Sequence, residues 1–248
     1  MLSNLITALV AGILATMNAG RTARERARAE LTREITDAAR RQLAEAGADG
    51  LSLRAVAREL GMVSSALYRY FPSRDDLLTA LILEAYEALG DAAAAADRAG
   101  ADPARRWRDV CTAVRAWSRA HPHEYALIYG SPIPGYQAPQ TTIAQAARVP
   151  LVMVGVLSDA LAAGVLTPPA DVPTPGPLLA EQIRQVAAST AQGLTGPVLT
   201  CALIAWTQLF GMISFELFGQ LVGSVDPSDE FFANAVGRMA AFVGLPPG

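Results

Sequence analysis

A run of hydroxyl and guanidinium side chains stands out between residues 61 and 78, which read GMVSSALYRYFPSRDDLL. Its polar members include Ser64, Ser65, Tyr68, Arg69, Tyr70 and Arg74. Such groups donate hydrogen bonds to phosphate oxygens and to base edges. A buried core element would not carry so many of them. The run therefore indicates a surface that contacts a polar, anionic partner.

The rest of the chain offers no enzymatic chemistry that a motif would reveal. It has no Gly-rich phosphate loop, no G-x-S-x-G and no H-E-x-x-H. Cys111 and Cys201 sit among apolar neighbours, which predicts buried, reduced thiols. His121 and His123 flank Pro122, a spacing that does not favour metal binding. We expect a non-enzymatic protein with no cofactor and no metal.

Charge is distributed unevenly along the 248 residues, although the net value is only −3. Residues 21–74 hold 11 arginines and 7 acidic residues, whereas residues 75–248 hold 9 arginines and 16 acidic residues. This pattern predicts a basic module on an acidic body. All 20 basic residues are arginine, whose planar guanidinium suits phosphate.

Helical periodicity runs through almost the whole sequence, and no segment alternates like a strand. A capping box beginning at Thr22 predicts the start of the first helix. Two short helices should follow, over LRAVAREL, which Ser52 can cap, and over residues 64–70, where Leu67 faces inward; a turn at Gly61 separates them. That arrangement is typical of a helix-turn-helix, whose second helix enters the major groove of DNA. With the second helix in that groove, Tyr68, Arg69 and Tyr70 would reach phosphates of the DNA backbone.

The remaining helices complete an all-α fold. They are expected over 73–96, started by Ser73 with Asp76, and from Pro103 onward, started by Asp102. Further helices are expected over 122–129, 141–163 with a bend at Pro150, 178–192, 197–222 and 228–243. The expected domains are an apolar extension (1–20), a helix-turn-helix DNA-binding domain (21–72) and a larger helical domain for ligand binding and dimerisation (73–248).

The stretch LSLRAVARELGMVSSALYRYFPSRDDLLTALI resembles the N-terminal DNA-binding domain of the TetR family of bacterial transcriptional regulators. The resemblance implies that Ser64, Ser65 and Tyr68 touch DNA and that Tyr70 holds a phosphate. Arg74 replaces the usual lysine at the start of the fourth helix, and Arg54 matches an exposed position early in the second helix. One departure is Val63, where the family usually has a Ser or Thr cap. Either Ser64 takes over that cap or the helix starts less firmly.

The second half resembles the subfamily with a WHG-type C-terminal domain, in HPHEYALIYGSPIPGYQAP and WTQLFGMISFELFGQL, although Phe210 stands where that subfamily often has histidine. Aromatic residues at helical spacing are either core or pocket, and the resemblance to ligand-sensing domains favours an apolar pocket for a small hydrophobic ligand. The candidate ligand-binding residues are Trp107, Trp117, Tyr125, Tyr129, Trp206 and Phe210. Glu216 is left open between a pocket group, a dimer seam and an exposed residue.

These features together predict a cytoplasmic, homodimeric repressor that binds a palindromic operator in double-stranded DNA and is released by a small apolar ligand. The last two helices would form the dimer interface. An activator or a ligand-independent regulator on the same fold is the alternative. Residues 1–17 are uncharged, and Met17 reads like a natural translation start. They are an upstream extension, a packed helical arm, or a membrane tether, of which the tether is the least expected.

Overall fold

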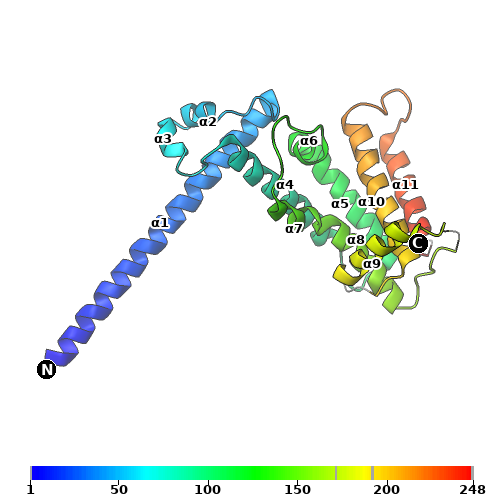
Figure 1. Ribbon diagram of the computed structural model, residues 1–248, viewed down its shortest axis with the longest axis horizontal. Helices are drawn as coiled ribbons and strands as arrows, with labels where there is room; N and C mark the ends of the chain where they lie inside the picture. The colour runs from blue at the N-terminus through cyan, green and yellow to red at the C-terminus, as the bar shows by residue number, and fades with distance from the viewer. Residues whose placement is uncertain (1, 171, 191–192, 247–248) are drawn as a thin grey trace. The chain divides into compact units, whose positions relative to one another are not determined.

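The computed structural model describes residues 2–170, 172–190 and 193–246, with side chains from residue 24 onward except at 189–190. This part of the chain is built of helices and contains no strand, so the predicted all-α class is confirmed (Figure 1). It divides into two compact units, Met1–Leu81 and Ile82–Gly248. We describe each unit by itself.

The first unit contains α1 (Leu2–Ala46), α2 (Leu53–Glu59), α3 (Ser64–Leu67) and the first turns of α4 (Arg74–Ala96). Helix α2 contacts both α1 and α3. Apolar side chains close this small core, and the most buried of them are Ile35, Val56, Leu67, Leu77 and Leu78. Leu67 is fully buried, as the helix-turn-helix pattern requires.

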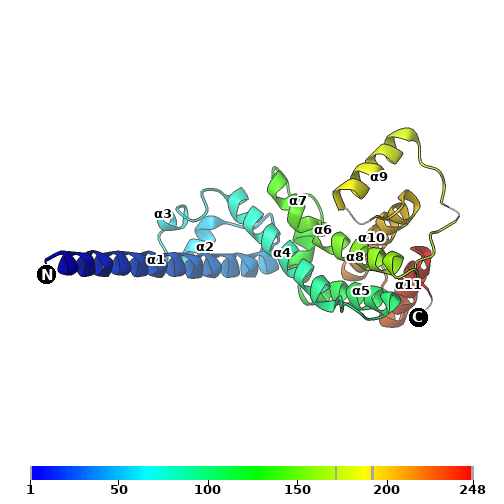
Figure 2. The ribbon, with the colours of Figure 1, turned by 90° about the horizontal axis from the view of Figure 1, so that it is seen from below.

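The predicted start of the first helix at Thr22 is wrong, because α1 runs without a break from Leu2 (Figures 1 and 2). No proline interrupts residues 2–46, so the capping-box residues lie inside the helix. The role expected for residues 1–17 rests on side chains that lie outside the described part.

Helix α3 is shorter than the predicted 64–70, because it ends at Leu67 and residues 68–70 form turns. The Tyr70 N–H donates to the Leu67 carbonyl at 2.8 Å, a three-residue spacing that closes the helix before Pro72. Val63 occupies the N-cap, and no side chain caps the helix. Ser64 therefore does not take over the cap.

The second unit holds the rest of α4 and, in chain order, α5 (Pro103–Ala120), α6 (Pro122–Tyr129), the 3₁₀ turn η1 (Gln140–Thr142), α7 (Ile143–Ala146), α8 (Arg148–Ala162), α9 (Pro177–Thr190), α10 (Gly196–Leu217) and α11 (Ser228–Phe242). Asp102 caps α5 by accepting from the Arg105 N–H at 2.9 Å. Helix α5 is central, since it contacts α6, α8, α10 and α11. Cys111 and Cys201 are free and buried, as predicted, and burial raises the pKa of both thiols.

The bend predicted at Pro150 falls instead at Ala147, between α7 and α8, where the chain turns by 41°. The reason is that proline has no N–H to donate to the carbonyl four residues earlier, and its ring clashes with that carbonyl. The helix therefore breaks before the proline, and Pro150 sits in the first turn of α8.

Helix α10 ends at Leu217, five residues before the predicted end at 222. Gly219 has a φ of 81°, a left-handed conformation that ends helices. Helix α10 is long and apolar enough to cross a membrane, and 44% of its most apolar 18-residue stretch is buried within the protein. A helix in the core of a folded domain has the same composition, so this property does not distinguish the two settings.

A buried arginine joins three helices of the second unit. The Arg115 guanidinium on α5 donates two hydrogen bonds to the Glu216 carboxylate on α10, at 2.7 and 2.6 Å. It also lies 2.7 Å from Asp229 of α11 and 4.7 Å from the centre of the Phe232 ring. Glu216 is thus an ion-pair partner within the chain itself, which accounts for a charge within an apolar helix.

Gly244 is a position where only glycine fits. Its φ is 93°, and a Cβ there would lie 2.1 Å from the Thr167 carbonyl oxygen. We expect Gly244→Ala to lower the free energy of unfolding by about 2 kcal/mol, through backbone strain and this clash. Urea denaturation followed by circular dichroism measures it.

Gly223→Ala is the matched control for Gly244→Ala. Gly223 has a similar φ of 76°, but a Cβ added there would meet no atom within 4 Å. We expect a loss of about 1 kcal/mol in this variant, from the left-handed backbone alone. An equal loss in the two variants would contradict the clash at Thr167.

Candidate nucleic-acid interface

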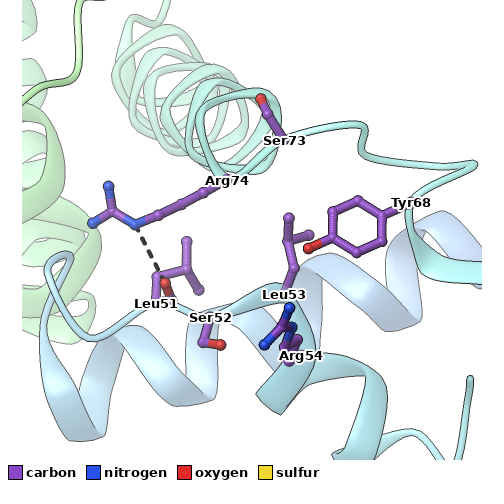
Figure 3. Close-up of a pocket in the computed structure, with 7 residues that line it drawn as sticks. All are labelled: Leu51, Ser52, Leu53, Arg54, Tyr68, Ser73 and Arg74. Carbon is purple, nitrogen blue, oxygen red and sulfur yellow. Dashed lines mark hydrogen bonds between the residues drawn. The ribbon is translucent and has the colours of Figure 1, made fainter. Parts of the chain in front are cut away.

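A pocket of 330 Å³ lies within the first unit, where α2 begins, α3 ends and α4 begins (Figure 3). It is lined by Leu51, Ser52, Leu53, Arg54, Tyr68, Ser73 and Arg74. Three of the residues predicted from sequence, Arg54, Tyr68 and Arg74, are therefore brought to one place. The lining combines hydroxyls and guanidinium groups, with no carboxylate among the described residues, which suits an anionic oxygen.

Arg54, Tyr68 and Ser73 are the exposed members of this pocket, and only the first two can reach far into solvent. In Figure 3 the Tyr68 hydroxyl and the Arg54 guanidinium both point toward the space beside Leu53. No acidic residue in the described part of the chain pairs with Arg54. Its charge is thus available to a partner, and Tyr68, which is 42% exposed, stands beside it.

Arg74 has a structural task as well. Its Nε donates to the Leu51 carbonyl at 3.3 Å (Figure 3), and its Nη2 donates to the Ala48 carbonyl at 2.6 Å. These bonds fix the turn between α1 and α2 to the start of α4. The guanidinium keeps its positive charge in the pocket, but two of its nitrogens already have partners.

Ser64, Ser65, Arg69 and Tyr70 lie outside this pocket. Ser65 and Arg69 are exposed and Ser64 is half-buried on α3. The serine hydroxyls form no hydrogen bond with any described residue. Tyr70 is half-buried, with the Arg28 guanidinium 5.1 Å above its ring. Arg28 of α1 is therefore fixed next to the end of α3 by a cation–π contact.

Ser52 and Ser73 have sequence patterns that predict only helix caps, and the structure places both in the pocket. Ser73 does cap α4, because its Oγ accepts from the Asp76 N–H at 3.1 Å. Ser52 occupies the N-cap of α2, but its side chain makes no capping bond. The only sequence signal that could have placed Ser52 in the pocket is its position two residues before Arg54.

A second, larger cavity of 660 Å³ lies in the second unit. Of the six aromatic residues predicted to bind a ligand, Tyr129 and Trp206 line it. Trp107, Tyr125 and Phe210 are buried in the core, and Trp117 stacks on His121 with ring centres 4.8 Å apart. The Tyr125 hydroxyl donates to the Phe210 carbonyl at 3.0 Å, which ties α6 to α10.

Most of the cavity wall is aliphatic, and aromatic spacing could not reveal it. Helices α7 and α8 supply Ala146, Leu151 and Met153, and α10 supplies Leu199 and Ala202. Their signal in the sequence is the apolar composition of segments 141–163 and 197–222, which by itself predicts only helices.

Helix α4 reaches the cavity through Tyr86. The same helix is joined to α8 by Arg148, which donates to the Glu87 carbonyl at 2.9 Å and to Asp91 at 2.5 Å. Gly90 makes this close approach possible, because a Cβ there would lie 2.8 Å from the Arg148 Cβ.

Comparison with known sequences gives matches over both units. The family described as "Bacterial regulatory proteins, tetR family" matches residues 35–81, and the family described as "Tetracyclin repressor-like, C-terminal domain" matches residues 107–239. The HTH-type transcriptional regulator Rv1816 of Mycobacterium tuberculosis is 44% identical over 210 residues, which cover 79% of this chain and 85% of that protein. The regulator Mb1846 of Mycobacterium bovis matches with the same values.

Solved structures agree with the sequence matches. The regulatory protein SCO4313 is 36% identical, with a TM-score of 0.71 over 88% of this chain and 98% of that one. A protein of unknown function from Rhodococcus sp. RHA1 is 26% identical, with a TM-score of 0.64 over 87% of this chain and 95% of that one. The TetR family regulator PfmR of Thermus thermophilus, at 18% identity and a TM-score of 0.55, shares the fold over 83% of this chain and 96% of that one.

Proposed function

Because this chain belongs to the TetR family of bacterial transcriptional regulators, and so carries a helix-turn-helix DNA-binding domain, we propose that it is a homodimeric repressor released from its operator by a small apolar ligand. The first unit would bind DNA, and the second would dimerise and bind the ligand. Access to chromosomal DNA makes the cytoplasm its expected place of action.

The observation that carries the DNA-binding role is the pocket at Arg54 and Tyr68. An unpaired guanidinium and a phenol that point to one space can hold one phosphate of the DNA backbone. Ser52, whose hydroxyl does not cap α2, is a further donor beside them. With a phosphate fixed there, Ser64 and Ser65 on α3 would face base edges, since short side chains allow close approach in the major groove.

Exposed apolar side chains on the last two helices support the homodimer. Ile204, Phe215 and Phe218 of the α10 region are between 46% and 56% exposed, and Phe231 and Phe242 of α11 are each 42% exposed. A pair of helices with such residues buries them against its symmetry mate in a four-helix interface. Two recognition helices would then lie about one DNA turn, ~34 Å, apart, or a simple multiple of it.

The cavity in the second unit supports release by a ligand. Its volume of 660 Å³ lies in the range that holds a drug-sized molecule, and its wall is mainly apolar. Because α4 lines this cavity through Tyr86, a bound molecule would act on α4 directly. Release requires only that the ligand prefer the conformation that binds DNA poorly.

The test is fluorescence anisotropy with DNA that flanks the gene, under increasing salt, with Tyr68→Ala as the comparison. We expect tight, salt-sensitive binding that is weakened about tenfold or more in the variant, since each protomer loses one phosphate contact. Equal binding by Tyr68→Ala would contradict the proposed interface. Deletion of the gene distinguishes a repressor from an activator, because neighbouring transcripts rise in the first case and fall in the second.

A further inference from the structure

The wall of the 660 Å³ cavity has no charged side chain among the described residues that line it. Its polar groups are the phenols of Tyr86 and Tyr129 and the indole of Trp206; every other lining side chain is an alanine, proline, methionine or branched aliphatic residue. All three polar residues carry an O–H or N–H. No carboxylate, amide or imidazole side chain from the described part of the chain joins them.

Both phenols remain protonated. Burial raises the pKa of Tyr86 and that of Tyr129 above the ordinary tyrosine value, and neighbouring tyrosines raise them further. Each can therefore donate a hydrogen bond at any physiological pH. The Tyr86 hydroxyl has only a long bond, at 3.4 Å, to the Ile128 carbonyl. The Tyr129 hydroxyl bonds no residue in the described part of the chain.

Aromatic packing fixes the Tyr129 ring in place. It stacks on Phe210 with centres 4.2 Å apart and lies 5.2 Å from the Tyr125 ring. The Tyr86 ring meets it edge-on at 6.0 Å. Two donors are thus held close together at one part of an apolar wall. The indole N–H of Trp206 is also buried without a partner among the described residues.

We propose that this cavity binds an uncharged, mainly aliphatic molecule with one hydrogen-bond acceptor, such as a ketone or an ester, whose oxygen is bound by Tyr129 and Tyr86. This inference rests on the ligand-release function proposed above and specifies its ligand. A neutral acceptor satisfies the donors, while its hydrocarbon part fills the aliphatic wall. An ionised group would lose its hydration with no opposite charge to replace it, which is strongly unfavourable.

The experiment compares two probes with the same carbon chain, 2-decanone and decanoate, at neutral pH and without DNA. Each is titrated against the full-length protein loaded with the neutral fluorophore N-phenyl-1-naphthylamine, and displacement is followed by fluorescence. We expect 2-decanone to displace the fluorophore and decanoate to bind at least ~100-fold more weakly. Tyr129→Phe should weaken 2-decanone about tenfold, because one hydrogen bond is lost.

Matched variants separate the cavity from the rest of the protein. Ala146→Phe fills the cavity from α7 and should exclude the fluorophore, whereas Ala144→Phe on the same helix is exposed, does not line the cavity and should bind it normally. Thr112→Val removes an exposed hydroxyl of α5 that does not line the cavity and serves as the control for Tyr129→Phe. Circular dichroism confirms that each variant is folded.

Each result decides the proposal. Decanoate binding as tightly as 2-decanone would overturn the uncharged ligand, as would failure of 2-decanone to displace a fluorophore that Ala146→Phe excludes. Equal fluorophore binding by wild type and Ala146→Phe would overturn the cavity itself. Operator release is measured separately by adding 2-decanone to the protein–DNA complex. A ligand that binds without releasing DNA would refute the proposed function and leave the ligand class standing.

Discussion

Arg54→Glu is expected to weaken operator binding about 1000-fold, because a hydrogen-bonded phosphate contact contributes about 2 kcal/mol and a dimer loses it at both half-sites. The pocket explains the size of the effect: Arg54 has no acidic partner in the described part of the chain, so its charge is available to the phosphate. The salt dependence should change too. The slope of log K against log salt should become shallower by about 2, since two phosphate contacts disappear.

Arg98→Glu is the control for this substitution. It makes the same change in net charge, and Arg98 is an exposed residue of the second unit. We expect its operator affinity to stay within about threefold of wild type at about 150 mM salt, where charges more than about 8 Å from the DNA are screened. Anisotropy titrations at several salt concentrations measure both variants. Equal losses in both would mean that net charge, and not the pocket, determines binding.

Glu216→Ala should lower the free energy of unfolding by about 4 kcal/mol, because it leaves the Arg115 guanidinium buried without its main partner. The Arg115 side chain is only 9% exposed, and Glu216 accepts two of its hydrogen bonds. Asp229 also pairs with Arg115, but its side chain is 73% exposed. We therefore expect it to replace Glu216 poorly in the variant. Urea denaturation followed by circular dichroism gives the value.

The double variant Arg115→Met/Glu216→Leu tests whether an unpaired charge is the cause. It removes both members of the pair and fills the space with apolar side chains, so most of the lost stability should return. Asp229 keeps Arg119 as a partner, at 3.1 Å. If the double variant were as unstable as Glu216→Ala, packing of the two side chains, rather than their charges, would be the larger effect.

The sequence predicted the elements whose signals are local. Asp102 before Pro103 and Ser73 before Asp76 are capping patterns within one turn, and both caps are present. The burial of Leu67 also follows from a local pattern, because the short helices of a helix-turn-helix share one core.

Features that depend on contacts distant in sequence could not be predicted this way. Arg115 and Glu216 are 101 residues apart, so nothing local showed that they pair. The cavity is lined by several separate helices, and its aliphatic residues look like core in any one of them. Pro150 signalled a break, but the missing N–H acts four residues earlier, so the predicted bend lies too late in the chain.

Helix α4 has a thermodynamic consequence for how such a regulator would respond. Its residue Arg74 lines the pocket of the first unit, and its residue Tyr86 lines the cavity of the second. Free energy is a state function, so any coupling along this helix acts equally in both directions. A molecule that weakens operator binding about tenfold must itself bind about tenfold more weakly to the protein on its operator. The concentration that half-occupies the operator-bound protein would then exceed the dissociation constant of the free protein by that same factor.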